Sequence, residues 1–196
     1  MLRPIRTLPA AVKPVSLEEA RAHLRVDVDD EDTLITALID AAISYLDGWS
    51  GVLGRCLVNQ VWKQSLSDWP ACRFIRLPFP DVSAATVKYF DAANAEQTVS
   101  ASLFERLEDE RGTIIWFGDE FTYPTVFDDR RDGVLVEFTA GYGASATDVP
   151  AALRHAMLLI IGHWYENRES VVIGNAPAAL PMAFDALIAP FRRVGI

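Results

Sequence analysis

The first fifty residues carry apolar side chains at helical spacing. Ser16 and Glu19 stand at the spacing of a capping box, in which each side chain bonds the backbone amide of the other residue, so a first helix is predicted from this point. An acidic turn over residues 27–32 follows, and its carboxylates favour the positive end of a second helix. That helix is long, and its wide apolar surface implies burial against more than one neighbour. Its apolar positions form two adjacent stripes, Leu34, Leu38, Ala41, Tyr45 and Trp49 in one and Ile35, Ile39, Ala42 and Leu46 in the other.

The middle of the chain changes to the period of two that is typical of β-strands. Side chains alternate between two faces over residues 58–66, which predicts a strand there. Proline, glycine and asparagine residues punctuate the segments that follow and predict turns between them. The acidic and aromatic connection over residues 119–132 predicts an exposed loop. Further strands are predicted over residues 74–77, 86–90, 114–117 and 134–139.

The last fifty residues return to the helical pattern. Asp148 is a candidate cap and Pro150 suits a first helical turn, so a third helix is predicted from here through Trp164. Residues 169–180 contain glycine, asparagine and proline and predict a mobile linker. A short terminal helix is predicted from Pro181, ending in two basic residues that suit a helix C-terminus. Its apolar and basic positions are Phe184, Leu187, Ile188, Phe191, Arg192 and Arg193.

This order of segments predicts the fold class. Helices at both ends with strands between them indicate an α+β protein, in which a helical bundle core of about four helices carries an inserted antiparallel β subdomain. The predicted parts are an N-terminal helical part over residues 1–56, the β subdomain over 57–147, and the completing C-terminal helices over 148–196. A chain of 196 residues that is 51% hydrophobic is long enough to bury a sizeable core without a covalent staple.

Composition narrows the possible partners. The formal net charge of −9 argues against nucleic-acid binding, which depends on clustered basic residues. The longest apolar run, residues 156–162, is far shorter than the roughly 20 residues that span a bilayer, and no signal-peptide core follows the N-terminus. We therefore expect a soluble chain made in the cytoplasm. Cys56 and Cys72 lack partners at zinc-ligand spacing. Two free thiols are favoured, and a disulfide between them remains the alternative.

The chain shows no recognisable catalytic or cofactor motif. The acidic turn lacks the glycine and the final glutamate of a calcium-binding loop, so helix capping is the preferred interpretation. Gly141 and Gly143 form a lone Gly-x-Gly with no lysine after it, which indicates a simple turn. His163 and Glu166 are spaced to share a metal ion, but no third ligand accompanies them. No nucleophile elbow or cysteine–base pair is present. The residues predict neither an enzyme nor a bound metal or cofactor.

Several short motifs follow one another in a set order. Residues 15–26 read Val-Ser-Leu-Glu-Glu-Ala-Arg-Ala-His-Leu-Arg-Val, and the most specific motif is His-Trp-Tyr-Glu-Asn-Arg-Glu at residues 163–169. Between them come Gln60-Val61-Trp62, Leu77-Pro78-Phe79-Pro80, Phe138-Thr139-Ala140-Gly141-Tyr142-Gly143 and Val149-Pro150. Their order and spacing resemble the phage head–tail connector (adaptor) family, in the version with a β insertion between the helices. The resemblance covers nearly the whole chain apart from residues 1–14 and the loop over residues 117–132.

The resemblance implies a structural subunit of a virion or phage-like particle, including a gene transfer agent. Such subunits form a ring, usually a dodecamer, in the neck beneath the portal. The implied partners are the portal protein, a stopper or tail-terminator protein and further copies of the chain. DNA would pass through the channel without specific binding, and no membrane is involved. The candidates for the portal or ring interface are Leu34, Leu38, Tyr45, Trp49, Trp164, Phe184, Leu187, Phe191, Arg192 and Arg193.

Two other functions stay open at this level. One is a small metal-dependent hydrolase that uses His163 and Glu166, and the other is a non-viral interaction module. The resemblance also leaves open whether the particle is a phage, a prophage remnant or a gene transfer agent. A further hypothesis is that the terminal helix, tethered by its linker, becomes ordered on binding the portal.

Overall fold

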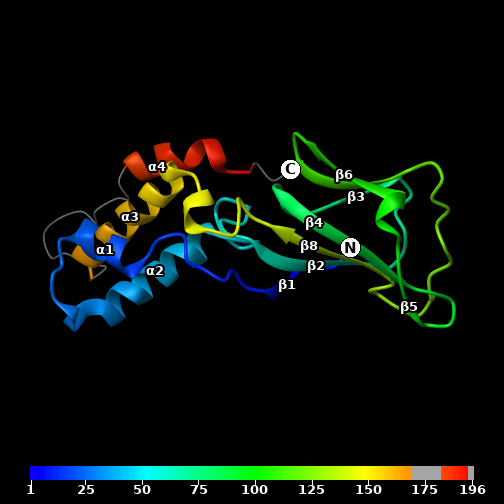
Figure 1. Ribbon diagram of the computed structural model, residues 1–196, viewed down its shortest axis with the longest axis horizontal. Helices are drawn as coiled ribbons and strands as arrows, with labels where there is room; N and C mark the ends of the chain where they lie inside the picture. The colour runs from blue at the N-terminus through cyan, green and yellow to red at the C-terminus, as the bar shows by residue number, and fades with distance from the viewer. Residues whose placement is uncertain (169–181, 194–196) are drawn as a thin grey trace, which may run out of the picture. The chain divides into compact units, whose positions relative to one another are not determined.

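The computed structural model describes residues 1–168 and 182–193. The chain forms two compact units, a β unit over residues 1–11 and 59–142 and a helical unit over residues 12–58 and 143–196 (Figure 1). This composition confirms the predicted α+β class. Residues 1–11 lie in the β unit because their strand pairs with a strand there, whereas the sequence pattern placed them with the N-terminal helices. The predicted linker over residues 169–180 lies outside the described residues.

The helical unit contains the four predicted helices. They are α1 (Leu17–Leu24), α2 (Asp32–Leu46), α3 (Ala151–Glu166) and α4 (Met182–Ile188). Single 3-10 turns, η1 (Asp29–Glu31), η3 (Ala146–Asp148) and η4 (Ala189–Phe191), precede α2 and α3 and extend α4. Helix α3 packs against α1, α2 and α4, and Figure 1 shows α4 lying beside α3.

The start of α1 follows the sequence prediction. The Glu19 amide donates to the Ser16 hydroxyl at 3.1 Å, and the Glu19 carboxylate accepts from the Ser16 amide at 2.9 Å. The helix ends at Arg25, whose φ of 59° is left-handed and stops the helical hydrogen-bond pattern. The predicted capping box is therefore confirmed.

One stripe of α2 forms the centre of the helical unit. Ile35, Ile39, Ala42 and Leu46 are its buried residues. The neighbouring stripe is only partly covered: Leu34 and Leu38 are half-buried, and Tyr45 is exposed. The buried stripe that begins with Ile35 lets α2 pack closely on α3, because both helices present continuous apolar faces. The buried residues of α3 are Leu153, Ala156, Met157, Ile160 and Ile161.

The β unit consists of two antiparallel sheets. The larger has the strand order β1-β2-β8-β4-β5 and the smaller has the order β3-β7-β6. The strands are β1 (Ile5–Leu8), β2 (Gln60–Leu66), β3 (Phe74–Arg76), β4 (Val82–Phe90), β5 (Glu96–Thr98), β6 (Phe104–Asp109), β7 (Gly112–Phe117) and β8 (Val134–Ala140). A 3-10 turn, η2 (Ala101–Leu103), precedes β6. The five strands predicted in this region are present, whereas β1, β5 and β6 were not predicted.

The inner face of the larger sheet follows the predicted alternation. Trp62 of β2 lies opposite Phe138 of β8, and Val136 of β8 lies between Gln64 and Val87. All five side chains are buried. Gln64 is one of the few buried polar residues, and its amide nitrogen donates to the Leu2 carbonyl at 2.6 Å. This bond holds the chain before β1 against β2.

An aromatic cluster fills the space beneath the smaller sheet. The Trp69 ring lies 5.2–5.6 Å from the rings of Tyr89, Phe117, Phe121 and Tyr123, and its indole nitrogen donates to the Pro124 carbonyl at 2.8 Å. Phe121 belongs to the segment predicted as an exposed loop, yet its side chain is buried. The loop prediction is wrong at this point, because the aromatic residues of the loop pack inward while its acidic residues stay in solvent.

Candidate interaction surface

The described residues contain no group of three or more His, Cys, Asp or Glu side chains that could hold a metal ion. His163 is half-buried and Glu166 exposed at the end of α3. The His155 ring lies edge-on to His23 of α1 at 6.3 Å. Cys56 is buried and Cys72 exposed, and the two form no disulfide. The geometry of the described part of the chain therefore gives the hydrolase hypothesis no support.

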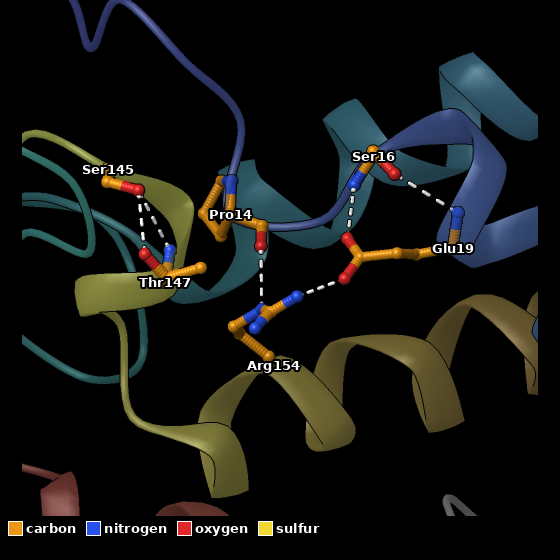
Figure 2. A network of polar contacts seen from close by, with 6 residues as sticks. All are labelled: Pro14, Ser16, Glu19, Ser145, Thr147 and Arg154. Atoms are coloured by element: carbon orange, nitrogen blue, oxygen red, sulfur yellow. Dashed lines mark hydrogen bonds and ion pairs between the residues drawn. The ribbon is translucent and has the colours of Figure 1, made fainter.

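A polar network joins the start of α1 to α3 (Figure 2). Glu19 uses one carboxylate oxygen for the capping box and the other for the Arg154 guanidinium of α3. Arg154 also donates from Nε to the Pro14 carbonyl at 3.2 Å. Ser145 caps the short turn before α3 through the Thr147 amide at 3.3 Å. The network joins the start of α1 to the first turns of α3 through the side chains of Glu19 and Arg154.

The acidic turn is organised by a single arginine of α1. Arg21 donates to Asp29 at 2.6 Å and to the Asp27 carbonyl at 3.0 Å, and it lies 3.3 Å from a carboxylate oxygen of Asp32. A guanidinium at the centre of these oxygens occupies the place that a cation would need. This arrangement argues against a calcium loop, but neither η1 nor α2 receives a side-chain cap from the turn, so its carboxylates serve the ion pairs with Arg21 instead of the predicted capping.

The motif at residues 163–169 holds the helical unit together. The Tyr165 hydroxyl and the Arg168 guanidinium both donate to the Glu31 carboxylate, the latter at 2.5 Å. These two donors, Tyr165 first, lower the pKa of Glu31. The Trp164 ring packs edge-on against Tyr45 of α2 at 6.3 Å. The most specific motif of the sequence therefore ties the end of α3 to both ends of α2.

The structure brings together some of the predicted interface residues. Tyr45, Trp164 and Phe184 form one aromatic contact, with the Phe184 ring 6.2 Å from Tyr45. Trp49 is 48% exposed just after α2. Leu34, Leu38, Leu187, Phe191 and Arg193 are half-buried, and Arg192 is exposed. The Arg193 amide donates to the Leu53 carbonyl at 2.9 Å, so its backbone belongs to the helical unit.

Phe184 does not lie on a surface. Its side chain is completely buried, and Ile188 one turn later is nearly so. The terminal helix packs on α3, and these two are its buried residues. The prediction of Phe184 as an interface residue is therefore corrected. The short helix is held in the core by a buried side chain, and that side chain is Phe184.

A salt bridge clamps the smaller sheet at one end. Arg76 of β3 donates both terminal nitrogens to the Asp109 carboxylate at 2.6 and 2.5 Å, across the intervening strand β7. Asp109 also accepts from the Arg111 amide in the β6–β7 turn at 2.8 Å. The hydrogen bond from Arg76 is the largest cause that lowers the pKa of Asp109 to about 2.

We expect the salt bridge between Arg76 and Asp109 to make the unfolding free energy depend on pH in the acidic range. The folded state holds the pKa of Asp109 below its ordinary value of 3.8, so the stabilisation is complete above that value and is lost as pH falls through about 2. The difference in unfolding free energy between the wild type and Asp109→Asn should therefore shrink between pH 4 and pH 2. Urea titrations across this range measure it, and a constant difference would contradict the assignment.

Sequence analysis missed two apolar surfaces in the β unit. One is on the smaller sheet around Trp116 and Leu107, and the other is on β1 around Ile5 and Leu8. The unbroken apolar run Ile114-Ile115-Trp116-Phe117 was the available signal, because a strand with one solvated face should alternate. For β1 the flanking prolines concealed the strand pattern.

Comparison with known proteins identifies the kind of protein. Residues 14–68 match the phage gp6-like head–tail connector protein family. The whole chain matches a chain in the virion of a native gene transfer agent particle, with a TM-score of 0.79, 25% identity and coverage of 97% of that chain. The chain is a structural protein of the head–tail connector type. The neck of the empty gene transfer agent particle gives the same values, and the neck of the native particle matches with a TM-score of 0.69. No curated protein matches at comparable significance.

These matches confirm the predicted resemblance and the prediction of a structural protein rather than an enzyme. The family match also covers the first two helices of the helical unit. Residues 14–68 include α1 and α2, so the family match includes the capping box, the acidic turn and the buried stripe. Within the described residues, no helix is both long enough and apolar enough to cross a bilayer.

Proposed function

We propose that this connector occupies the neck of a tailed phage or a phage-derived particle and forms a ring between the portal and the stopper or tail. The full-length match to a gene transfer agent chain carries this proposal, because it covers all of this chain and nearly all of the other. The matched necks were determined with sixfold and twelvefold symmetry, which supports a dodecamer. A closed ring needs two different surfaces on each subunit, one for each neighbour.

We propose that Tyr45, near the end of α2, and Trp49, just after it, contact the portal or a neighbouring subunit. Tyr45 is held in place by Trp164 and Phe184, and Trp49 next to it in the apolar stripe is half in solvent. Rigid aromatic side chains that are partly exposed are typical anchors of protein interfaces. Arg192 is also exposed, and we include it as a basic contact for an acidic partner.

Electron microscopy of the chain mixed with its portal tests this proposal. We expect a ring of connector density on the portal for the wild type. Trp49→Ala should reduce occupancy of the ring by about tenfold or more, since hot-spot aromatics commonly contribute 2 kcal/mol or more. Val28→Ala, at a residue that is also exposed, is the matched control and should assemble normally. A portal that stays bare with the wild-type chain would refute the proposed function.

The negative net charge of the chain predicts that the ring binds DNA weakly. Twelve copies of a chain with a formal charge of −9 place roughly 100 negative charges around the channel. Repulsion should keep the passing DNA from sticking. We expect no retention of double-stranded DNA in a mobility-shift experiment at low salt, where electrostatic binding is strongest. Retention under these conditions would contradict the proposed passive channel.

A further inference from the structure

Helix α1 is held on the helical unit by few contacts. Ala20 is its one buried residue. The Glu19 carboxylate binds Arg154 of α3, and Arg154 also donates to the Pro14 carbonyl just before the helix (Figure 2). A helix of eight residues is too short to be stable alone, so α1 stays folded only through contacts with its neighbours. Each further contact between α1 and α3 therefore contributes measurably to keeping α1 in place.

A pair of histidines forms a second contact between α1 and α3. His23 lies in the last turn of α1, and His155 follows Arg154 on α3. Their ring centroids are 6.3 Å apart and their ring planes are nearly perpendicular, at 88°. The His23 ring also lies over Gly162 of α3, because a Cβ built on this glycine would stand 3.5 Å from His23 Nε2. The His23 ring therefore packs on α3 at two points, and one of them is a second titratable group.

The charged groups around the pair do not neutralise it. Among the described residues, neither histidine ring forms a hydrogen bond or an ion pair. Glu19, one turn before His23 on α1, is bound to Arg154. The remaining carboxylates near this contact belong to the acidic turn and to the start of α2, and they bind other partners. Those carboxylates are Asp29 and Asp32, which bind Arg21, and Glu31, which binds Tyr165 and Arg168.

Protonation of the pair opposes the docking of α1. Burial first, and then the charge of His155, lower the pKa of His23 below its ordinary value of 6.5. The undocked helix therefore binds a proton more readily than the docked one, so docking is fully favoured above pH 6.5 and weakens as pH falls below it. Two positive charges 6.3 Å apart at a solvent-exposed site shift an equilibrium by about three- to tenfold at low salt.

We propose that the His23–His155 pair is an acid-sensitive release for helix α1. At neutral pH the uncharged rings pack edge-on, and α1 stays docked on α3. Both residues are exposed, so protons reach the rings without prior unfolding. In mild acid both rings are charged, and their repulsion makes α1 open more often. Opening uncovers the surfaces of α2 and α3 against which α1 packs. This property belongs to the single subunit and does not depend on the proposed ring.

Hydrogen exchange of the purified subunit, followed by mass spectrometry, tests the release. Peptides from α1 and α2 are compared at pH 7.5 and pH 5.0 in low salt, after correction for the pH dependence of intrinsic exchange. We expect the protection of α1 to fall about three- to tenfold relative to that of α2. Raising the salt concentration to 1 M should reduce this difference, because salt screens the repulsion between exposed charges.

The chain supplies its own matched control, because it contains three histidines and only two belong to the pair. His155→Gln keeps a polar side chain without the charge, and the fall in α1 protection should then be less than twofold. His163→Gln changes the third histidine, which lies on α3 outside the pair, and should behave like the wild type. Both substitutions are at positions that are not fully buried, so both variants should fold.

Titration of the histidine rings by nuclear magnetic resonance gives an independent readout. His155→Gln should raise the pKa of His23 without restoring its ordinary value, because burial is the larger cause of the lowering. An unchanged His23 titration in this variant would show that the two rings do not interact. Equal loss of α1 protection in the wild type and in His155→Gln would assign the acid response to other groups. A loss spread evenly over α1, α2 and α3 would indicate unfolding of the whole helical unit, and each of these results would overturn the release.

Discussion

Replacing Phe184 by alanine is expected to lower the unfolding free energy of the helical unit by about 3–5 kcal/mol, the range for deleting a buried aromatic side chain. The Phe184 ring is fully buried against Tyr45, and it anchors the short helix α4 on α3. Removing it leaves a cavity and releases a helix too short to be stable alone. Denaturant unfolding followed by circular dichroism measures the loss.

The matched control for Phe184 lies in the same helix. Met182 is 89% exposed, so Met182→Ala should change the unfolding free energy by no more than about 0.5 kcal/mol. If both variants were equally mild, Phe184 would be a surface residue, as the sequence-based interface prediction assumed. A large loss for Phe184→Ala alone would identify it as part of the subunit core.

Replacing Trp69 by alanine should have an effect of similar size in the β unit, about 3–5 kcal/mol. The Trp69 ring contacts four other aromatic rings and donates to the Pro124 carbonyl. Its loss removes the packing that holds Phe121 and Tyr123, so the connection between β7 and β8 should become sensitive to trypsin at Arg131. Denaturant unfolding and limited proteolysis measure the two consequences.

Trp116 provides the comparison for Trp69. It is also a tryptophan of the β unit, but it lies on the outer face of the smaller sheet and is 38% exposed. Trp116→Ala should cost about 1 kcal/mol or less in unfolding free energy, within the usual range for partly exposed positions. Equal destabilisation by the two replacements would contradict both assignments.

Local signals in the sequence were sufficient for much of the helical unit. The capping box of Ser16 and Glu19 could be predicted because its partners are three residues apart. The breaks between helices and the amphipathic pattern of α2 could be predicted for the same reason. The connector resemblance could be recognised because it depends on the order and spacing of short motifs. In each case the decisive interactions connect residues that are close in the sequence.

The strands that were missed lack such signals. Strand β6 carries charged side chains on both faces, and only Phe104 is even half-buried, so the strand shows no apolar alternation. Strand β1 is short, lies between two prolines and is exposed throughout. Both strands exist because a neighbouring strand supplies hydrogen bonds, β7 for β6 and β2 for β1. Their propensity is set by that pairing more than by their own residues.

The amino-acid order was enough to establish an α+β connector with helices at both ends, because periodicity and capping act within a few residues. It could not distinguish the two stripes of α2, since both are apolar and the buried one is selected by packing against α3, which lies more than a hundred residues later in the chain. For the same reason it could not separate Phe184, which is a core anchor, from Trp49, which faces solvent. Burial is a property of the packed arrangement, and side chains of the same chemistry become core or surface according to which distant helix or strand covers them.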